Sequence, residues 1–529
     1  MHLRTTFASP LLLLVGLAPL GKADPSILPL SGGNYWKMTN SYSGAQYSVS
    51  LENTRTIGTK VMTLFRIKTT VWELSLLVSP NGEDIVMEGI DYSPAARMYL
   101  DRPMPLFTAS AAAGTSWQSA LGRVTLLSRT ATVTSPKGTF SNCLQFRMDF
   151  GGSTLDWYFA PGMGPVRMGT DSFSFLLTDY RSLAYTPPAG VSQTGACPPV
   201  GVTPNPAAQG DHTTAGQLAR LLMARDAGTR FLHLSASWKE LEPSPGTFNF
   251  AELRRYMDWA KQYGMKAALT IKTVDSTSLS VPADLASLPL DHPTLTTRFK
   301  ALLAALSSGI TSAVTHINIA NEANTYLDAR PQAIAAFLSF YLAGVGQLKA
   351  SGVTAPIGVT FAYSDFRRND ATFRVVSPYC EQISFTYYPL RPDWTLRDIA
   401  DVSWDIGEMV SAASGKPLAL TEVGYPSHAT FGGGTAGQSS FYAAVLDEVK
   451  LHPGKIQGVS FFLMSDPPES VVEAITQAYS QAGSPQFGVF VGSLGLFTVA
   501  DTAKPAWNTF STKAQQLATA ASCSSRAIY

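Results

Sequence analysis

This chain of 529 residues has almost no net charge, few cysteines and few long apolar runs. Lysine and arginine number 39 against 38 aspartates and glutamates, so nucleic acid is not an expected partner and a neutral polymer or small molecule fits better. Beyond the N-terminus no segment reaches, without interruption, the roughly 20 apolar residues that span a bilayer, and we expect no transmembrane segment. The four cysteines show no metal-ligand spacing and are expected to be structural, and the sequence leaves their pairing open: Cys143, Cys197, Cys380 and Cys523.

The N-terminus has the pattern of an export signal. His2 and Arg4 precede a short apolar core at residues 11–18, and Gly21-Lys22-Ala23 offers small residues at a cleavage site. This order is typical of a cleaved signal peptide over residues 1–23, which predicts a secreted or periplasmic protein. The remaining length and a hydrophobic content of 45% predict two domains with large cores.

The first of these domains, residues 24–186, has a β pattern. Short runs rich in β-branched and aromatic residues are separated by turn sequences such as Pro80-Asn81-Gly82 and Pro136-Lys137-Gly138. No helical periodicity interrupts them, so an antiparallel sheet or a sandwich is expected. The domain carries no cluster of histidines, cysteines or acids that suggests chemistry, and we interpret it as a scaffold or a carbohydrate-binding accessory.

A Pro- and Gly-rich stretch ends this domain, and strands then alternate with helices. Residues 187–197 are predicted to be the linker, residues 198–515 the second domain and residues 516–529 a C-terminal tail. Eight strands are predicted, beginning at 200, 230, 266, 314, 356, 382, 417 and 458. Eight βα units without a glycine-rich phosphate loop favour a (β/α)8 barrel, with an open doubly wound sheet as the alternative.

Two glutamates stand at the ends of predicted strands four and seven. Glu322 follows an apolar run as part of Asn321-Glu322, and Glu422 ends another run 100 residues later. Strand ends that face each other across a barrel can bring two carboxyl groups to one sugar, one as proton donor and the other as nucleophile. The competing interpretation is that each is a first-turn acid beside a helix N-cap.

These motifs resemble those of a large clan of retaining glycoside hydrolases built on (β/α)8 barrels. Asn321-Glu322 matches the clan's acid/base motif, and residues 421–427 (TEVGYPS) look like the nucleophile segment of plant-type endo-β-1,3-glucanases. Residues 384–389 (SFTYYP) resemble arabinogalactan endo-β-1,4-galactanases, in which a tyrosine bonds the nucleophile. The resemblance covers residues 198–515 and departs from the pattern at two places. His233 stands where many members carry an arginine, and Phe462 lies in a strand end that lacks the usual tryptophan.

The resemblance implies a glycoside hydrolase with Glu322 as acid/base and Glu422 as nucleophile, acting on a β-linked oligo- or polysaccharide and needing no metal or organic cofactor. Only one of two adjacent tyrosines can face the site, because side chains alternate along a strand. Further residues near strand ends are candidates for binding sugar, since aromatic rings stack on pyranose C–H faces; the full set of substrate-binding candidates is Asn321, Tyr387, Tyr388, Trp238, Asn324 and Tyr425. Asp466 is interpreted as a turn or cap residue. The alternative function is a non-catalytic carbohydrate-binding or cell-surface protein on the same barrel.

Overall fold

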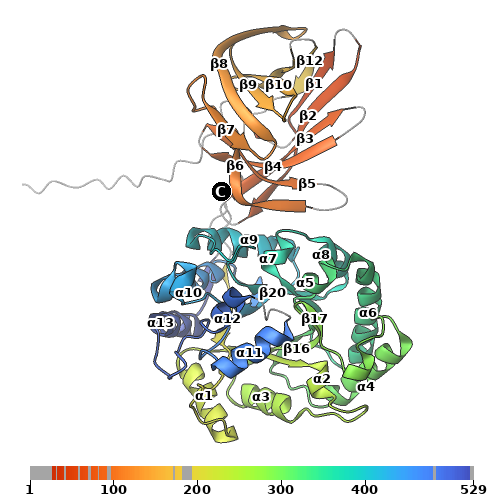
Figure 1. Ribbon diagram of the computed structural model, residues 1–529, viewed down its shortest axis with the longest axis vertical. Helices are drawn as coiled ribbons and strands as arrows, with labels where there is room; N and C mark the ends of the chain where they lie inside the picture. Colours follow the sequence, from red (N-terminus) through yellow and green to blue (C-terminus); the bar gives the residue numbers. More distant parts are fainter. Residues whose placement is uncertain are drawn as a thin grey trace, which may run out of the picture.

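The computed structural model describes residues 27–524 apart from 31–32, 41–42, 58–59, 70–72, 82, 92–96, 171–172, 182–193 and 480–483. The predicted signal peptide and most of the predicted linker therefore lie outside the described residues. Two units are apparent, a β unit at the top of Figure 1 and a ring of helices around a second sheet below it.

The β unit is a single antiparallel sheet of 12 strands in the order β6-β5-β4-β3-β2-β1-β12-β11-β10-β9-β8-β7. Most of these strands are joined to the next along the chain by hairpins, as the turn sequences predict. Their bounds are β1 Tyr35–Asn40, β2 Gln46–Ile57, β3 Lys60–Thr69, β4 Glu73–Asn81, β5 Asp84–Asp91, β6 Arg97–Phe107, β7 Ser116–Ser119, β8 Gly122–Ser135, β9 Gly138–Asp149, β10 Thr154–Ala160, β11 Gly164–Gly169 and β12 Ser174–Arg181.

This sheet curls so that distant strands share one core. The ring of Trp157 on β10 lies 6.0 Å from Tyr47 on β2, 6.5 Å from Phe65 on β3 and 6.1 Å from Phe107 on β6, measured between centroids. All four side chains are buried. The sequence left a sheet or a sandwich open, and the strand order shows one sheet folded onto itself.

The second unit contains eight parallel strands in the order β14-β22-β21-β20-β19-β18-β16-β15. The two ends of this order also meet, since the backbone N–H of Arg230, just before β15, donates to Val200 O on β14 over 2.7 Å. The strands therefore form a closed ring, as in a (β/α)8 barrel. They are β14 Val200–Val202, β15 Phe231–Ser237, β16 Lys266–Asp275, β18 Val314–Asn321, β19 Ile357–Ala362, β20 Gln382–Tyr387, β21 Leu418–Val423 and β22 Ile456–Phe461.

One principal helix follows each of these strands and packs on the outside of the ring (Figure 1). These helices are α1 Thr214–Asp226, α3 Ala251–Gln262, α4 Pro293–Ser307, α6 Ile334–Ala350, α8 Ala371–Val376, α9 Val402–Ala412, α10 Gly434–Val449 and α13 Pro505–Thr519. Two shorter helices, α11 Glu469–Ala478 and α12 Pro485–Val491, separate β22 from α13, and in Figure 1 they lie in front of the ring. All eight strands begin within two residues of the positions that the sequence predicts.

One helical segment among the described residues, Pro331–Ala350 with helix α6, is long and apolar enough, by length and composition, to cross a bilayer. Phe337, Phe340 and Tyr341 are fully buried in the core that the ring and its helices share, whereas Leu342 is exposed.

The C-terminal boundary also differs from the prediction. Helix α13 runs through residue 516, where a tail was expected to begin. Beyond it β23, Cys523–Ser524, pairs with β13, Thr194–Gly195, and Cys523 forms a disulfide with Cys197. The C-terminal segment is therefore fastened to the start of the barrel unit. Cys143 and Cys380 are free and buried.

The two units contact each other beside helices α7 (Tyr363–Phe366) and α9. Trp404 on α9 packs against three buried residues of the large sheet, Met62, Leu64 and Leu77. The guanidinium of Arg367 donates to the backbone oxygen of Leu100 on β6 over 3.0 Å. Strand β6 is thereby placed beside the loops that follow β19 and β20.

Candidate active site

Glu322 occupies a conformation that few residues other than glycine adopt. It follows β18 with φ 47° and ψ 43°, and Ala320 two residues earlier has φ 98°. Such left-handed backbone is uncommon outside glycine and is found preferentially at functional sites. Although Glu322 holds the N-cap position of the short helix α5 (Ala323–Asp328), its side chain makes no capping bond. The carboxyl group is thus free of the capping role that was the competing interpretation.

The carboxyl group of Glu322 instead points to neighbouring strand ends. Its Oε1 accepts a hydrogen bond from the hydroxyl of Thr386 on β20 over 2.6 Å. Burial, followed by the nearby charge of Glu422, raises the pKa of Glu322 to about 8, against the opposing effect of the Thr386 and Ser276 hydrogen bonds. A carboxyl group in this environment holds its proton near neutral pH.

Glu422 lies on β21, with its side chain 14% exposed. The hydroxyl of Tyr388 donates to its Oε2 over 2.9 Å. Burial raises the pKa of Glu422 to about 7, while the Tyr388 hydrogen bond, the positive charge of Lys272 and a hydrogen bond from Asn321 act to lower it. Of the two glutamates, Glu422 therefore loses its proton more readily.

Thr386 connects the two glutamates geometrically. It is the direct partner of Glu422 in the register of β20 and β21, and its hydroxyl donates to Glu322. The strand order β21-β20-β19-β18 places Thr386 next to Glu422 and two strands away from Glu322, and the hydrogen bond from Thr386 to Glu322 spans that gap. The structure thus brings both predicted catalytic residues to one place at the mouth of the ring.

A third carboxylate, Asp275, lies beside them at the end of β16. It accepts from Asn321 Nδ2 over 3.1 Å and from the hydroxyl of Tyr479 over 3.0 Å, and Lys272 Nζ lies 2.8 Å from its Oδ2. Sequence analysis missed Asp275, Lys272 and Tyr479. Strand 266–272 was predicted to end at Lys272, whereas β16 continues to Asp275, and nothing in the sequence places Tyr479, which follows α11, opposite a strand 200 residues earlier.

Lys272 is the cation of this group. Burial by itself acts to lower its pKa, but Asp275, Glu422 and Glu240 raise it overall, so the ammonium group stays charged. His233 does not assist, because burial and then the charge of Lys272 lower its pKa to about 3. Its Nδ1 lies 3.8 Å from Glu422 Oε1 and its Nε2 lies 2.9 Å from Thr270 Oγ1. The imidazole is neutral in both contacts.

The side chains of Tyr387 and Tyr388 point in opposite directions, because side chains alternate along a strand. Only Tyr388 faces the site. Tyr387 points to the outside of the ring, where its hydroxyl donates to Asp405 over 2.9 Å and its ring packs on Phe441. Since Tyr387 is fully buried there, its predicted contact with substrate is corrected.

Three more of the predicted sugar contacts are corrected for the same reason. The indole of Trp238 is fully buried between Phe299 and Phe340 and donates to Glu242 over 2.7 Å. Asn324 is fully buried, and its side-chain amide donates to the backbone oxygen of Ala362 and accepts from the backbone N–H of the same residue. Tyr425 is 3% exposed and packs on Phe441. Each was placed correctly near a strand end, but its side chain faces the packed layer between strands and helices.

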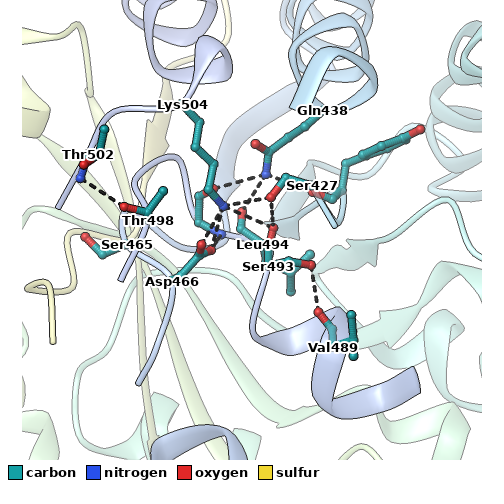
Figure 2. Close-up of polar contacts among 12 residues, drawn as sticks. Ser427, Gln438, Ser465, Asp466, Val489, Ser493, Leu494, Thr498, Thr502 and Lys504 are labelled. Carbon is teal, nitrogen blue, oxygen red and sulfur yellow. Dashed lines mark hydrogen bonds and ion pairs between the residues drawn. The ribbon is translucent and has the colours of Figure 1, made fainter. Parts of the chain in front are cut away.

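A buried ion pair stabilises the loops that follow β21 and β22 (Figure 2). Lys504 Nζ lies 2.7 Å from Asp466 Oδ2 and donates to Ser427 Oγ over 2.8 Å, and both charged side chains are less than a tenth exposed. Gln438 on α10 adds a bond to the backbone oxygen of Tyr425 over 3.0 Å. Asp466 thus joins the loop after β22, through Lys504, to the loop after β21, a structural role consistent with the turn or cap function expected for it.

Among the described residues, no group of three or more histidine, cysteine, aspartate or glutamate side chains is arranged to hold a metal ion. The chemistry available at the mouth of the ring is that of carboxyl groups, an ammonium group and phenols.

Comparison with known proteins finds a resemblance to solved structures only. No family model matches the sequence, and no curated protein matches it. Solved structures that resemble the chain are glycoside hydrolases. A GH5_18 protein from Streptomyces cattleya in complex with GlcNAc is 15% identical, with a TM-score of 0.49 over 61% of this chain and 81% of its own.

Two further structures extend this comparison. An exo-β-1,4-mannosidase from Opitutaceae bacterium strain TAV5 is 17% identical, with a TM-score of 0.49 over 62% of this chain and 61% of its own. A family 39 glycoside hydrolase from Bacteroides cellulosilyticus WH2 is 12% identical, with a TM-score of 0.44 over 93% of this chain and 79% of its own. At these values neither substrate nor mechanism transfers to this chain.

Proposed function

We propose that this chain is a retaining glycoside hydrolase in which Glu322 is the acid/base and Glu422 the nucleophile. The observation that carries the proposal is the pairing of two glutamates from separate strand ends, both adjacent to Thr386, in environments that favour different protonation states. Environments that separate the pKa values of two carboxyl groups identify the acid and the base.

In the first step the Glu422 carboxylate attacks the anomeric carbon and Glu322 gives its proton to the glycosidic oxygen. A glycosyl ester on Glu422 forms and the leaving alcohol departs neutral. In the second step Glu322 takes a proton from water, whose oxygen attacks the same carbon, and Glu422 is released as a carboxylate. Two inversions retain the configuration at the anomeric carbon.

The neighbouring residues supply the electrostatics of this cycle. The Tyr388 hydroxyl and the Lys272 ammonium group favour ionised Glu422. Burial and the charge of Glu422 favour protonated Glu322. When the glycosyl ester forms, the charge on Glu422 disappears, so the pKa of Glu322 falls and Glu322 stays ionised, which is the form that accepts a proton from water in the second step.

Substrate contacts are proposed for Asn321 and Tyr388. The Asn321 amide nitrogen is held by Asp275, while its Oδ1 is buried without a partner among the described residues. An unpartnered acceptor beside both glutamates is suited to a sugar hydroxyl. A β-linked oligo- or polysaccharide is the proposed substrate class, and export after signal-peptide cleavage remains a prediction from the sequence.

The test is hydrolysis of aryl β-glycosides and β-glycans by wild type, Glu422→Ala and Glu322→Ala. We expect Glu422→Ala to lose activity on all substrates. Glu322→Ala should lose activity on natural linkages yet keep the first step with nitrophenyl leaving groups, which need little protonation. Glu252→Ala, an exposed glutamate on α3, is the matched control. Product from wild type and Glu422→Ala at equal rates would overturn the nucleophile assignment, and no product on a broad panel would favour the carbohydrate-binding alternative.

A further inference from the structure

A cleft beside the proposed catalytic centre is lined by arginines. This cavity, of about 380 Å³, begins at Tyr388, whose hydroxyl bonds Glu422, and extends past Ser364 to Trp394. Four guanidinium groups line it: Arg367, Arg368, Arg391 and Arg397. Tyr388 therefore both bonds Glu422 and forms part of the wall of this cavity.

Two of the four arginines are neutralised by buried acids. Arg367 lies 3.4 Å from Asp405 and 3.6 Å from Glu408, and Arg397 lies 3.0 Å from Asp405. Both acids are fully buried. These pairs hold α7, α9 and the loop after β20 together and leave no charge for a ligand.

Arg391 is different. Its Nη1 donates to the hydroxyl of Thr395 and to the backbone oxygen of Leu396, both neutral, and its Nε is buried without a partner. Within the described chain no carboxylate lies within ion-pair distance of it. Asp393 is the nearest acid along the loop, but it is held by the N–H of Thr395 over 3.0 Å and by its hydroxyl over 2.7 Å.

The loop that carries Arg391 is pre-organised. Two backbone bonds cross it, from Arg391 N to Thr395 O over 2.8 Å and from Trp394 N to Arg391 O over 2.9 Å. Trp394 is held at φ 65° and packs on Phe487 and Phe490. A guanidinium group on such a rigid hairpin beside an indole can bind a carboxylate and stack a sugar ring together.

A second cavity, of about 660 Å³, continues from Arg391 towards the β unit. Leu100 and Met104 on β6 form its far wall, opposite Leu396 and Phe431. Arg391 lines both cavities, so its guanidinium group is accessible from two sides.

Arg368 adds to the positive charge of the first cavity. It pairs with Asp365, yet its side chain is half exposed at the rim. Asp365 also accepts from Thr325 over 2.6 Å. The charge that remains available to a ligand is thus centred on Arg391, with Arg368 as a neighbour.

We propose that the cleft between Tyr388 and β6 binds an anionic sugar, with Arg391 as the residue that recognises its charged group, so that the substrate is an acidic glycan. This inference rests on the proposed function, which assigns cleavage of the glycan to Glu322 and Glu422. A uronosyl carboxylate and a sulfate ester share the required chemistry, because both are anions whose oxygens accept N–H groups of a guanidinium.

The experiment compares β-linked oligouronides of four residues, the same oligomers with carboxyl groups reduced to alcohols, and an O-sulfated neutral oligosaccharide. Wild type, Arg391→Met and the control Lys300→Met, an exposed lysine on α4, are assayed for kcat/KM and for binding. Wild type should favour an anionic oligomer over its neutral counterpart. Arg391→Met should lose about tenfold to a hundredfold on that oligomer and less than about twofold on the neutral one, with Lys300→Met unchanged.

Calorimetric binding to Glu422→Gln separates the two proposals. If nothing is hydrolysed but the anionic oligomer still binds and Arg391→Met weakens it, the subsite stands and the catalytic proposal fails. Comparing the oligouronides with the O-sulfated oligosaccharide shows which charged group Arg391 recognises. Equal kcat/KM and equal affinity for charged and neutral oligomers, with no effect of Arg391→Met in a variant that unfolds like wild type, overturns the inference.

Discussion

The hydroxyl of Tyr388 donates a hydrogen bond to Glu422 Oε2 over 2.9 Å, while its neighbour Tyr387 turns away to Asp405. Replacing Tyr388 by phenylalanine removes a bond that favours ionised Glu422. We expect Tyr388→Phe to lower kcat/KM about tenfold to a hundredfold, the usual effect of losing a hydrogen bond to a charged group. The acidic limb of the pH profile should move to higher pH. Tyr387→Phe is the control, since it should lower thermal stability and leave the pH profile in place.

Lys272 should also determine the pH at which the acidic limb of kcat/KM lies. It is the cation whose charge lowers the pKa of Glu422, since His233 is neutral. In Lys272→Met that pKa rises, and the acidic limb of kcat/KM should move up by roughly one pH unit. Lys239→Met, at an exposed position beyond the neighbouring strand β15, should leave the limb unchanged. An unmoved limb in Lys272→Met would show that Lys272 only supports Asp275 structurally.

Glu322 should make stability fall as pH rises. Its pKa is raised from 4.5 to about 8 in the folded chain, so the folded state holds a proton that the unfolded state releases. Between these two pH values unfolding becomes progressively easier. Glu322→Gln removes this effect, so its Tm should match wild type near pH 4.5 and exceed it by about 2 °C or more at pH 8. A Tm difference that is the same at both pH values would contradict the buried, protonated state.

The disulfide between Cys197 and Cys523 should stabilise the barrel unit. It closes a loop across a sequence separation of 326 and fastens β23 to β13. Loss of such a bond costs about 2–4 kcal/mol in the free energy of unfolding. Cys197→Ser, Cys523→Ser and the double variant should be equally destabilised in urea, because each removes the same bond. A double variant with the summed effect of the single ones would contradict the pairing.

The sequence placed the strands well because each barrel strand is a short apolar run bounded by turn residues. The same feature located Glu322 and Glu422, since both interrupt such runs at their ends. The direction of a side chain just beyond a strand is harder to predict. Tyr388 faces the ring, whereas Tyr425 faces the helices, and the difference depends on packing against Phe441 that no local pattern records.

Contacts between residues far apart in the chain could not be predicted from the sequence either. Tyr479 reaches Asp275 because the segment holding α11 and α12 folds in front of the ring, and this depends on tertiary contacts rather than on local periodicity. Trp238 was expected to stack on sugar because it follows a strand. The capping box of Ser237 and Glu240 instead begins helix α2 (Trp238–Leu241) there and turns the indole into the core.

The most direct test of the central claim is to trap the glycosyl ester. A panel of 2-deoxy-2-fluoro-β-glycosides with dinitrophenyl leaving groups is incubated with the enzyme, which is then digested with a protease and mapped by mass spectrometry. The fluorine slows both formation and hydrolysis of the ester, and the activated leaving group restores the rate of formation alone, so the ester accumulates. We predict one added sugar on the peptide that contains Glu422, and none in Glu422→Ala. A sugar attached to Glu322 or Asp275 instead would contradict the assignment of Glu422 as nucleophile.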